Sequence, residues 1–127
     1  MDPYEQASTA EEIIQLVIRF NDMLNAHSVE GMMFFLGEDC VFENTFPAPD
    51  GTRYEGRAAI HEFWEEFFLV DQEQTIEIEE IFACEDRCIM RWNYRWNESG
   101  IVGHVRGVDI YTIQDHQIIE KLSYVKG

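Results

Sequence analysis

One carboxylate stands in the middle of an apolar stretch near the end of the sequence. In HVRGVDIYTI, His104 to Ile113, Asp109 lies between Val108 and Ile110. Burying an ionised acid among branched apolar neighbours costs several kcal/mol, so Asp109 should be paired, protonated or turned toward a cavity. In a cavity it could act as a general acid or base, or donate a hydrogen bond to a ligand carbonyl. The alternative is a structural hydrogen bond to a neighbouring tyrosine or to the backbone.

Further side chains could contact a ligand. The amide of Asn44 could orient a ligand carbonyl or a water, or could simply bond a loop. Several large apolar side chains could form a wall around a flat apolar ligand, although they could equally fill the core. These candidate ligand-binding side chains are Phe20, Phe42, Trp64, Trp92, Tyr94 and Tyr111.

Composition narrows the classes of partner. The net charge is −16, from 25 acidic and 9 basic residues, which argues against nucleic acid or an anionic membrane surface. Apolar runs such as MMFFL are too short to span a bilayer, and the acidic N-terminus lacks a signal-peptide pattern, so we expect a cytoplasmic protein.

The three cysteines also bear on chemistry. Cys40, Cys84 and Cys88 are odd in number and lie in apolar segments, which indicates reduced, buried thiols. The spacing of Cys84 and Cys88 lacks a second ligand pair nearby, and no nucleotide-binding or hydrolase motif is present. We therefore expect neither a metal nor a cofactor.

The elements that must position Asp109 follow from the hydrophobic period. A capping box at Ser8 to Glu11 precedes a helix predicted from Ala10 to Ala26, and Ser28 precedes a second helix over Val29–Leu36. A third helix follows over 57–68. Alternating segments predict strands over 40–46, 74–84, 87–97, 104–113 and 117–127. The pattern predicts one α+β domain over residues 1–127, with three helices packed on one face of a curved antiparallel sheet.

The strand period also sorts side chains into faces. Met90, Trp92, Tyr94 and Trp96 share one face and must cover the core. Asp109 shares a face with Gly107, Tyr111 and Ile113, so periodicity alone allows it to face inward or outward. We expect Asp109 to face the helices. We expect no cationic partner for it, because Arg91, Arg95 and Arg106 fall on the opposite face.

Three stretches carry a family resemblance: LNAHSVEGMMFFLGEDCVFEN, DGTRYEGRAAIHEFW and RGVDIYTIQDHQIIEKLSYVKG. They resemble the nuclear transport factor 2-like (NTF2-like) superfamily, specifically its SnoaL-like branch, which includes ketosteroid isomerases and polyketide cyclases. The resemblance implies a cone-shaped, cystatin-like barrel whose sheet lines a hydrophobic pocket. It also implies a homodimer formed through the outer face of the sheet, where Val108 and Ile110 lie beside Arg91, Asn93 and Arg95.

Carried over residue by residue, the resemblance is mixed. Asp109 matches the inward aspartate of the isomerases, whereas Asn44 stands at the position of their general base and Phe20 at that of their oxyanion tyrosine. Neither replacement can do that chemistry, so a true ketosteroid isomerase is not expected. The sequence instead favours a pocket for a small, carbonyl-bearing apolar molecule, with isomerase-type or aldol-cyclase-type proton transfer through Asp109. A non-catalytic ligand-binding or accessory module is the alternative, and whether the protein is an enzyme stays open.

Overall fold

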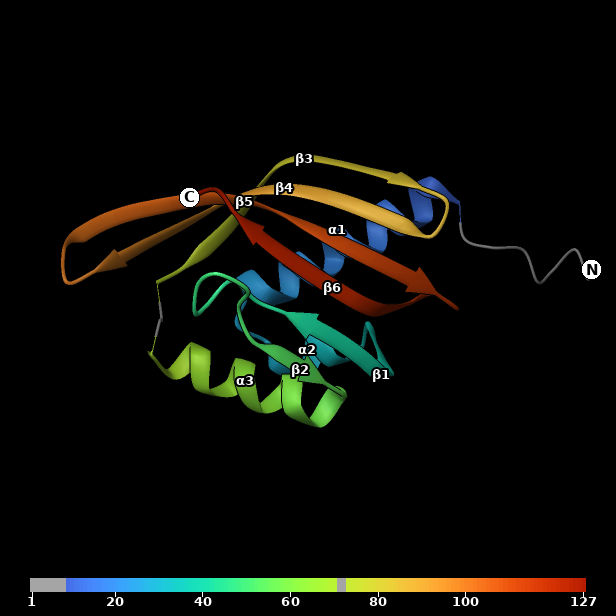
Figure 1. The fold of residues 1–127 in the computed structure, drawn as a ribbon, viewed down its shortest axis with the longest axis horizontal. Helices are drawn as coiled ribbons and strands as arrows, with labels where there is room; N and C mark the ends of the chain where they lie inside the picture. The colour runs from blue at the N-terminus through green and yellow to red at the C-terminus, as the bar shows by residue number, and fades with distance from the viewer. Residues whose placement is uncertain (1–8, 71–72) are drawn as a thin grey trace, which may run out of the picture.

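A computed structural model describes residues 9–70 and 73–127. Three helices accompany a single six-stranded sheet (Figure 1). The helices are α1 (Ala10–Asn25), α2 (Val29–Met33) and α3 (Arg57–Val70). The strands are β1 (Leu36–Glu43), β2 (Arg53–Glu55), β3 (Thr75–Cys84), β4 (Arg87–Glu98), β5 (Ile101–Gln114) and β6 (Gln117–Val125).

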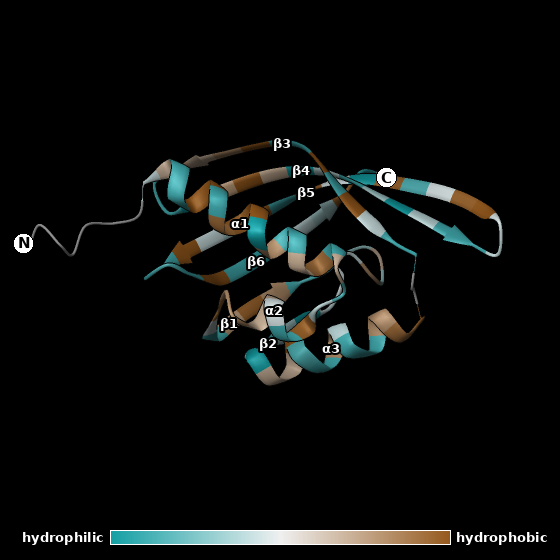
Figure 2. Ribbon diagram, turned by 180° about the vertical axis from the view of Figure 1, so that it is seen from behind, coloured by the Kyte–Doolittle hydropathy of each residue, from teal (hydrophilic) through white to brown (hydrophobic). Residues whose placement is uncertain are grey.

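The sheet is curved and open, with strand order β2-β1-β6-β5-β4-β3. Seen from behind, α1 lies across β3 to β6, while α2 and α3 lie beside β1 and β2 (Figure 2). The predicted α+β cone is therefore confirmed. Two details differ from the prediction: β1 pairs with β6 in parallel, and the short edge strand β2 was not predicted. No helix in the described part of the chain is long and apolar enough to cross a membrane.

Helix α1 begins at Ala10, as predicted, and its capping box lies one residue later than expected, at Thr9 to Glu12. The Thr9 hydroxyl accepts from the Glu12 amide at 3.2 Å, and the Glu12 carboxylate accepts from the Thr9 amide at 3.4 Å. Two of the backbone N–H groups at the helix start are thereby satisfied. The apolar stripe that follows is buried, as its helical spacing predicts; it comprises Ile13, Val17, Phe20 and Leu24.

Two asparagines fasten α1 to the start of β3. Asn21 and Asn25 donate from their side chains to the Ile76 carbonyl, at 3.0 and 2.9 Å. The Ile76 amide donates back to Asn25 Oδ1 at 2.8 Å. These amides replace the partners that an edge strand lacks on its outer side.

The predicted boundaries were wrong between α2 and β1, and also where β1 ends, at Glu43 instead of Phe46, and where β5 begins, at Ile101 instead of His104. Helix α2 ends at Met33, and β1 starts at Leu36 instead of Cys40. Leu36 pairs with Ile118 of β6, so the parallel partner draws this part of the chain into the sheet. Phe42 is inward on β1, with 4% of its surface exposed.

The cysteines fall into two environments. Cys40 and Cys88 are buried and free, and burial raises the pKa of Cys40 to about 11 and that of Cys88 to about 12. Cys84, at the end of β3, is exposed, so the expectation of a buried thiol was wrong there. The strand period turns it outward just before the turn to β4.

His61 joins α2 to α3. Its two ring nitrogens each lie 2.6 Å from a carboxylate oxygen, one of Glu30 and one of Glu65. The hydrogen bond that the His61 ring donates to Glu30, together with the charges of both glutamates, raises the pKa of His61 above its usual value. His61 therefore lies half-exposed on the polar side of α3, with an acid beside each of its ring nitrogens.

Candidate functional site

Asp109 lies on the inner face of the sheet, as predicted. It is 3% exposed and sits opposite Met90 of β4 and Ser123 of β6. Residues directly opposite one another on neighbouring strands share a face, so Met90 and Ser123 also point inward. The predicted inward orientation is thereby confirmed by register as well as by burial.

The Asp109 carboxylate is held by two ring-bearing neighbours. Trp92 Nε1 donates to Asp109 Oδ1 at 2.9 Å, and the Tyr111 hydroxyl donates to Oδ2 at 3.4 Å. Burial, and then the charge of Asp109, raises the pKa of Tyr111 well above its usual value. Tyr111 consequently keeps its proton and remains a donor to the carboxylate.

A buried lysine completes the arrangement and overturns the expectation of no cationic partner. Lys121 Nζ lies 3.4 Å from Asp109 Oδ2, with the two side chains only 10% and 5% exposed. It also donates to Ser123 Oγ at 3.0 Å and lies 5.3 Å from the centre of the Phe42 ring. Arg91, Arg95 and Arg106 pair with glutamates of β3 instead of Asp109. Lys121 of β6 supplies the positive charge beside Asp109.

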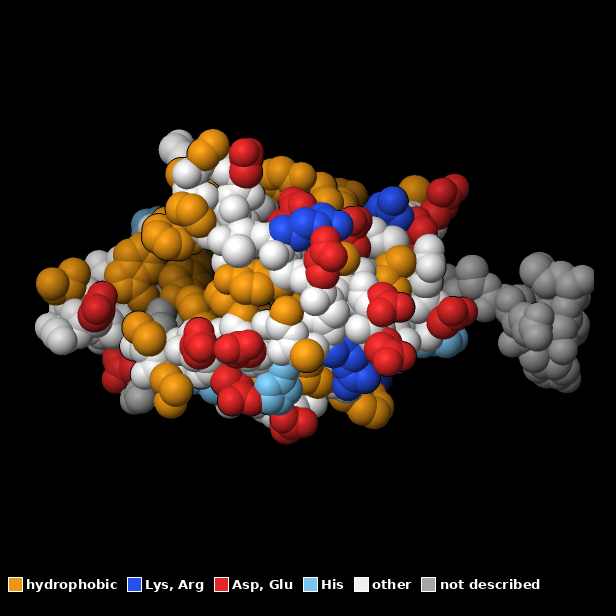
Figure 3. Space-filling view, turned by 60° about the horizontal axis from the view of Figure 1, so that its bottom comes forward, with side chains coloured by type: hydrophobic (Ala, Val, Ile, Leu, Met, Phe, Trp, Pro, Cys, Tyr) orange, Lys and Arg blue, Asp and Glu red, His pale blue; other side chains and the backbone are white. Residues whose placement is uncertain are grey.

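A cavity of about 570 Å³ opens beside this ion pair. Its walls are mostly aromatic and aliphatic, and Figure 3 shows hydrophobic side chains gathered around a hollow. Asp109, Lys121 and Ser123 form one polar end. The remaining lining comes from the β1–β2 loop and β2 (Asn44, Thr45, Phe46, Pro47, Thr52, Tyr54), from α3 (Phe63, Trp64, Phe67) and from β3 to β5 with the residue before them (Gln74, Ile76, Trp92, Tyr94, Val105).

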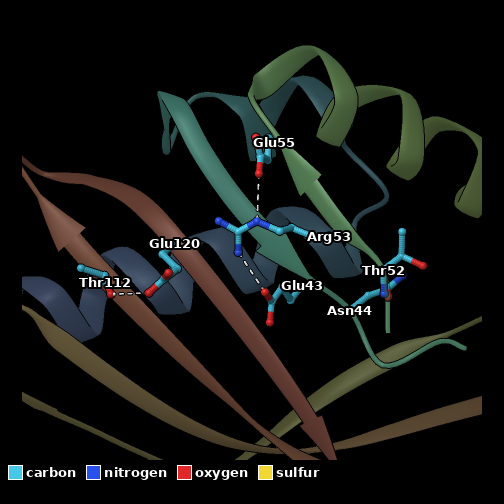
Figure 4. Close-up of polar contacts among 7 residues, drawn as sticks. All are labelled: Glu43, Asn44, Thr52, Arg53, Glu55, Thr112 and Glu120. Atoms are coloured by element: carbon cyan, nitrogen blue, oxygen red, sulfur yellow. Dashed lines mark hydrogen bonds and ion pairs between the residues drawn. The ribbon is translucent and has the colours of Figure 1, made fainter. Parts of the chain in front are cut away.

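Asn44 lines the cavity but uses its carbonyl to hold a loop. Its Oδ1 accepts from the backbone amides of Thr52, at 2.7 Å, and Phe46, at 3.3 Å. Figure 4 shows Asn44 beside Thr52, and next to them Arg53 of β2 bridging Glu43 and Glu55. The loop-bonding alternative therefore accounts for the oxygen of Asn44, while its NH₂ group remains a possible donor to a ligand.

Two buried polar side chains of the lining lack hydrogen-bond partners among the described residues. Gln74 is 2% exposed, and both its Nε2 and its Oε1 are unpaired. Trp64 is 6% exposed, and its Nε1 is unpaired. Buried polar groups are nearly always satisfied in folded proteins, so both groups need an explanation.

The structure brings together part of the predicted set. Asp109, Asn44, Trp64, Trp92 and Tyr94 line the cavity. Three others lie in the core instead, where Phe20 packs edge-on against both Phe42 and Tyr111, at 6.1 and 6.2 Å between ring centres. Of these three, Tyr111 still reaches the site through its bond to Asp109.

Sequence reasoning missed Lys121, Ser123 and Gln74. The period of two already places Lys121 and Ser123 on one face of QIIEKLSYVKG, which was a usable signal. What the sequence lacks is the register that sets Lys121 opposite Tyr111. Gln74 was predicted as the first residue of a strand over 74–84, whereas β3 begins at Thr75, and nothing in the sequence distinguishes its amide as buried.

The described residues contain no group of three or more histidines, cysteines or acids arranged to hold a metal ion.

Comparison with known proteins adds to this geometry. A family model described as the SnoaL-like domain matches residues 17–121. An NTF2-like protein of unknown function from Mesorhizobium loti has 34% sequence identity, covering 97% of this chain and 98% of that one, with a TM-score of 0.80.

More distant structures share the fold. A proposed ketosteroid isomerase from Kribbella flavida (18% identity, 93% of this chain and 80% of that one) has a TM-score of 0.79. A proposed SnoaL-like polyketide cyclase from Shewanella putrefaciens (19% identity, 93% and 91%) has a TM-score of 0.77. No functionally curated protein matches the chain in sequence.

Proposed function

Because this chain belongs to the SnoaL-like family of NTF2-like proteins, we propose that it binds a small, flat, carbonyl-bearing apolar molecule in the cavity beside Asp109. Apolar walls with a few convergent polar groups are the usual make-up of a small-molecule site. The observation that carries the proposal is the buried Asp109–Lys121 pair at one end of an aromatic-walled cavity.

The polar end suits a carbonyl group. An ammonium group has three donors, and two of those of Lys121 are directed at Asp109 and Ser123. The third is available to a carbonyl oxygen of a ligand, whose apolar body would then contact the rings of Trp92, Tyr94 and Trp64.

Calorimetric titration with para-acetylbiphenyl tests this binding. We expect saturable one-to-one binding by the wild type, and about tenfold weaker binding by Phe67→Ala, which removes one aromatic wall. Phe82→Ala is the matched control, because Phe82 is 49% exposed on β3 and outside the cavity lining. Equal losses for both variants, or no wild-type binding, would contradict the proposal.

Proton transfer at the carbon next to the carbonyl is a second candidate function. It is favoured by the presence of an acid and a cation at the same end of the cavity. Asp109 would take the proton from the carbon, the C–H electron pair would form the enolate double bond, and Lys121 would stabilise the negative oxygen. Returning the proton regenerates the carboxylate. Binding without this chemistry is the competing function.

Exchange of the acetyl protons of the same ketone in D₂O distinguishes the two functions. If the protein is catalytic, proton NMR will show the acetyl signal decaying faster with the wild type than in buffer, and Asp109→Asn will abolish the acceleration. Asp86→Asn, which removes an exposed carboxylate, is the control. Binding with no acceleration would leave the non-catalytic function.

We also propose a homodimer formed through the outer face of the sheet. Half-buried Val108 and Ile110 lie there with Arg91, Arg95 and Arg106. These arginines pair with Glu80, Glu77 and Glu79 of β3 at 3.1 to 3.5 Å, which leaves few unpaired charges to bury.

The cytoplasmic location expected from the sequence stays a prediction.

Sedimentation velocity at micromolar concentration tests the dimer. A stable interface buries about 1,600 Å² in total, so a charge placed at its centre should abolish it. We expect the wild type to sediment as a dimer and Val108→Asp as a monomer, whereas Val70→Asp, exposed on α3, should remain dimeric. A monomeric wild type would exclude this proposal.

A further inference from the structure

No hydrogen bond to the described residues accounts for the burial of the Gln74 side chain. Just along the chain, two asparagine amides hold the Ile76 backbone, so the start of β3 is already fastened. Gln74 lies in the same region, is 2% exposed, and leaves both polar ends of its amide unpaired among the described residues. A buried amide without partners is costly, and it persists most readily where a ligand supplies the partners.

Gln74 and Asp109 lie at different levels of the cavity. Asp109 is opposite Met90 on β4, whereas Thr75, next to Gln74, is opposite Arg95 on the same strand. Gln74 is therefore level with Trp96, six residues from Met90, and at ~3.3 Å per residue the side chains of Gln74 and Asp109 originate roughly 20 Å apart along the sheet. Both nevertheless line the same cavity. A molecule filling it therefore meets polar groups at two separate places.

From these positions we infer that the ligand is a hydroxylated apolar ketone, with its carbonyl beside Lys121 and a hydroxyl group at the far end bound by Gln74. A hydroxyl both donates and accepts, so it can satisfy Oε1 and Nε2 of one amide together. Trp64 lines the same cavity from α3, and its unpaired Nε1 would be a further donor to that oxygen. This inference rests on the proposed binding function and adds the class of ligand to it.

A pair of ketones tests the inference: para-acetylbiphenyl, and the same ketone with a hydroxyl group at the far para position. Calorimetry with the wild type should show about tenfold tighter binding of the hydroxylated ketone, because a site built around an amide discriminates against a ligand lacking the hydroxyl. Gln74→Met, which keeps the unbranched shape, should bind both ketones equally. It should also melt no lower than the wild type, since it removes an unpaired buried amide.

Matched variants make the result specific. Gln114→Met applies the same chemical change to an exposed residue at the end of β5 and should keep the tenfold preference. Trp64→Phe keeps an aromatic ring in the cavity wall but removes the indole N–H, so it should lose part of the preference for the hydroxylated ketone. This variant tests the inference if Gln74→Met is poorly folded. Equal wild-type affinities for the two ketones, or a preference that survives in Gln74→Met, would overturn the inference and leave ketone binding intact. Failure of both ketones to bind the wild type would overturn the proposed function and this inference together.

Discussion

Asp109→Asn is expected to lower the free energy of unfolding by about 3 kcal/mol at neutral pH. The asparagine can still accept from Trp92 Nε1, but it leaves Lys121 buried with no opposite charge. Removing one partner of a buried ion pair lowers the stability by far more than the intact pair contributes to it. The reason is that the remaining charge stays in the low-dielectric interior without a compensating charge. Lys121→Met should be destabilising for the converse reason.

Denaturant unfolding of the two single variants and the double variant measures the coupling. The double variant Asp109→Asn/Lys121→Met should lose clearly less than the sum of the single losses, because no stranded charge remains. Asp86→Asn breaks the exposed pair with Arg87, whose side chains are 46% and 51% exposed, and should change stability by less than about 1 kcal/mol. Additive losses in the double variant would show that Asp109 and Lys121 act independently.

Gly107→Ala is expected to destabilise the protein by about 1–3 kcal/mol and to weaken ketone binding. Gly107 lies opposite Trp92 on β4, and a Cβ atom there would overlap both the Trp92 ring and the Tyr124 carbonyl oxygen. The ring must move to make room, which withdraws its N–H from Asp109 and shifts one wall of the cavity.

Thermal unfolding and ketone titration of the same samples check this expectation. Gly37→Ala is the matched control, because a Cβ at Gly37 meets its nearest atom, Ile119 Cγ2, at 3.4 Å and so makes an ordinary contact. If Gly107→Ala behaves like Gly37→Ala in both measurements, the close packing of Trp92 over Gly107 does not position the site.

The parts of the fold that could be predicted are those with a strong local period. The apolar stripe of α1 and the aromatic stripe of α3 each specify a helix, and the alternation in β4 correctly assigned Trp92 to the inner face. In β5 the alternation predicted only which residues share the face of Asp109, and the expected inward orientation is confirmed by its burial in the structure. The strands that were missed or shifted lack such a period. β2 has three residues, and the start of β1 is defined by its pairing with β6.

The candidate site was predictable only in part, for a related reason. Asp109 is conspicuous because it interrupts an apolar run within one strand. Lys121 is not, because its burial depends on facing Tyr111 across two strands, which is a property of register. Gln74 is unremarkable in sequence, and only its burial without partners in the folded chain distinguishes it.

The parallel pairing of β1 with β6 has a consequence for the order of folding. Strand β1 lies beside β6, although β2, α3 and β3 to β5 separate them in sequence (Figure 1). Phe42 of β1, for example, pairs with Lys121 of β6. Contacts between such distant segments close a large loop and form late, since the entropy of closing it must be met before the contacts are made. During synthesis, β1 can pair with β2 but must wait for β6. Because β6 also carries the cation of the site, a nascent chain has no formed cavity until its last strand has emerged.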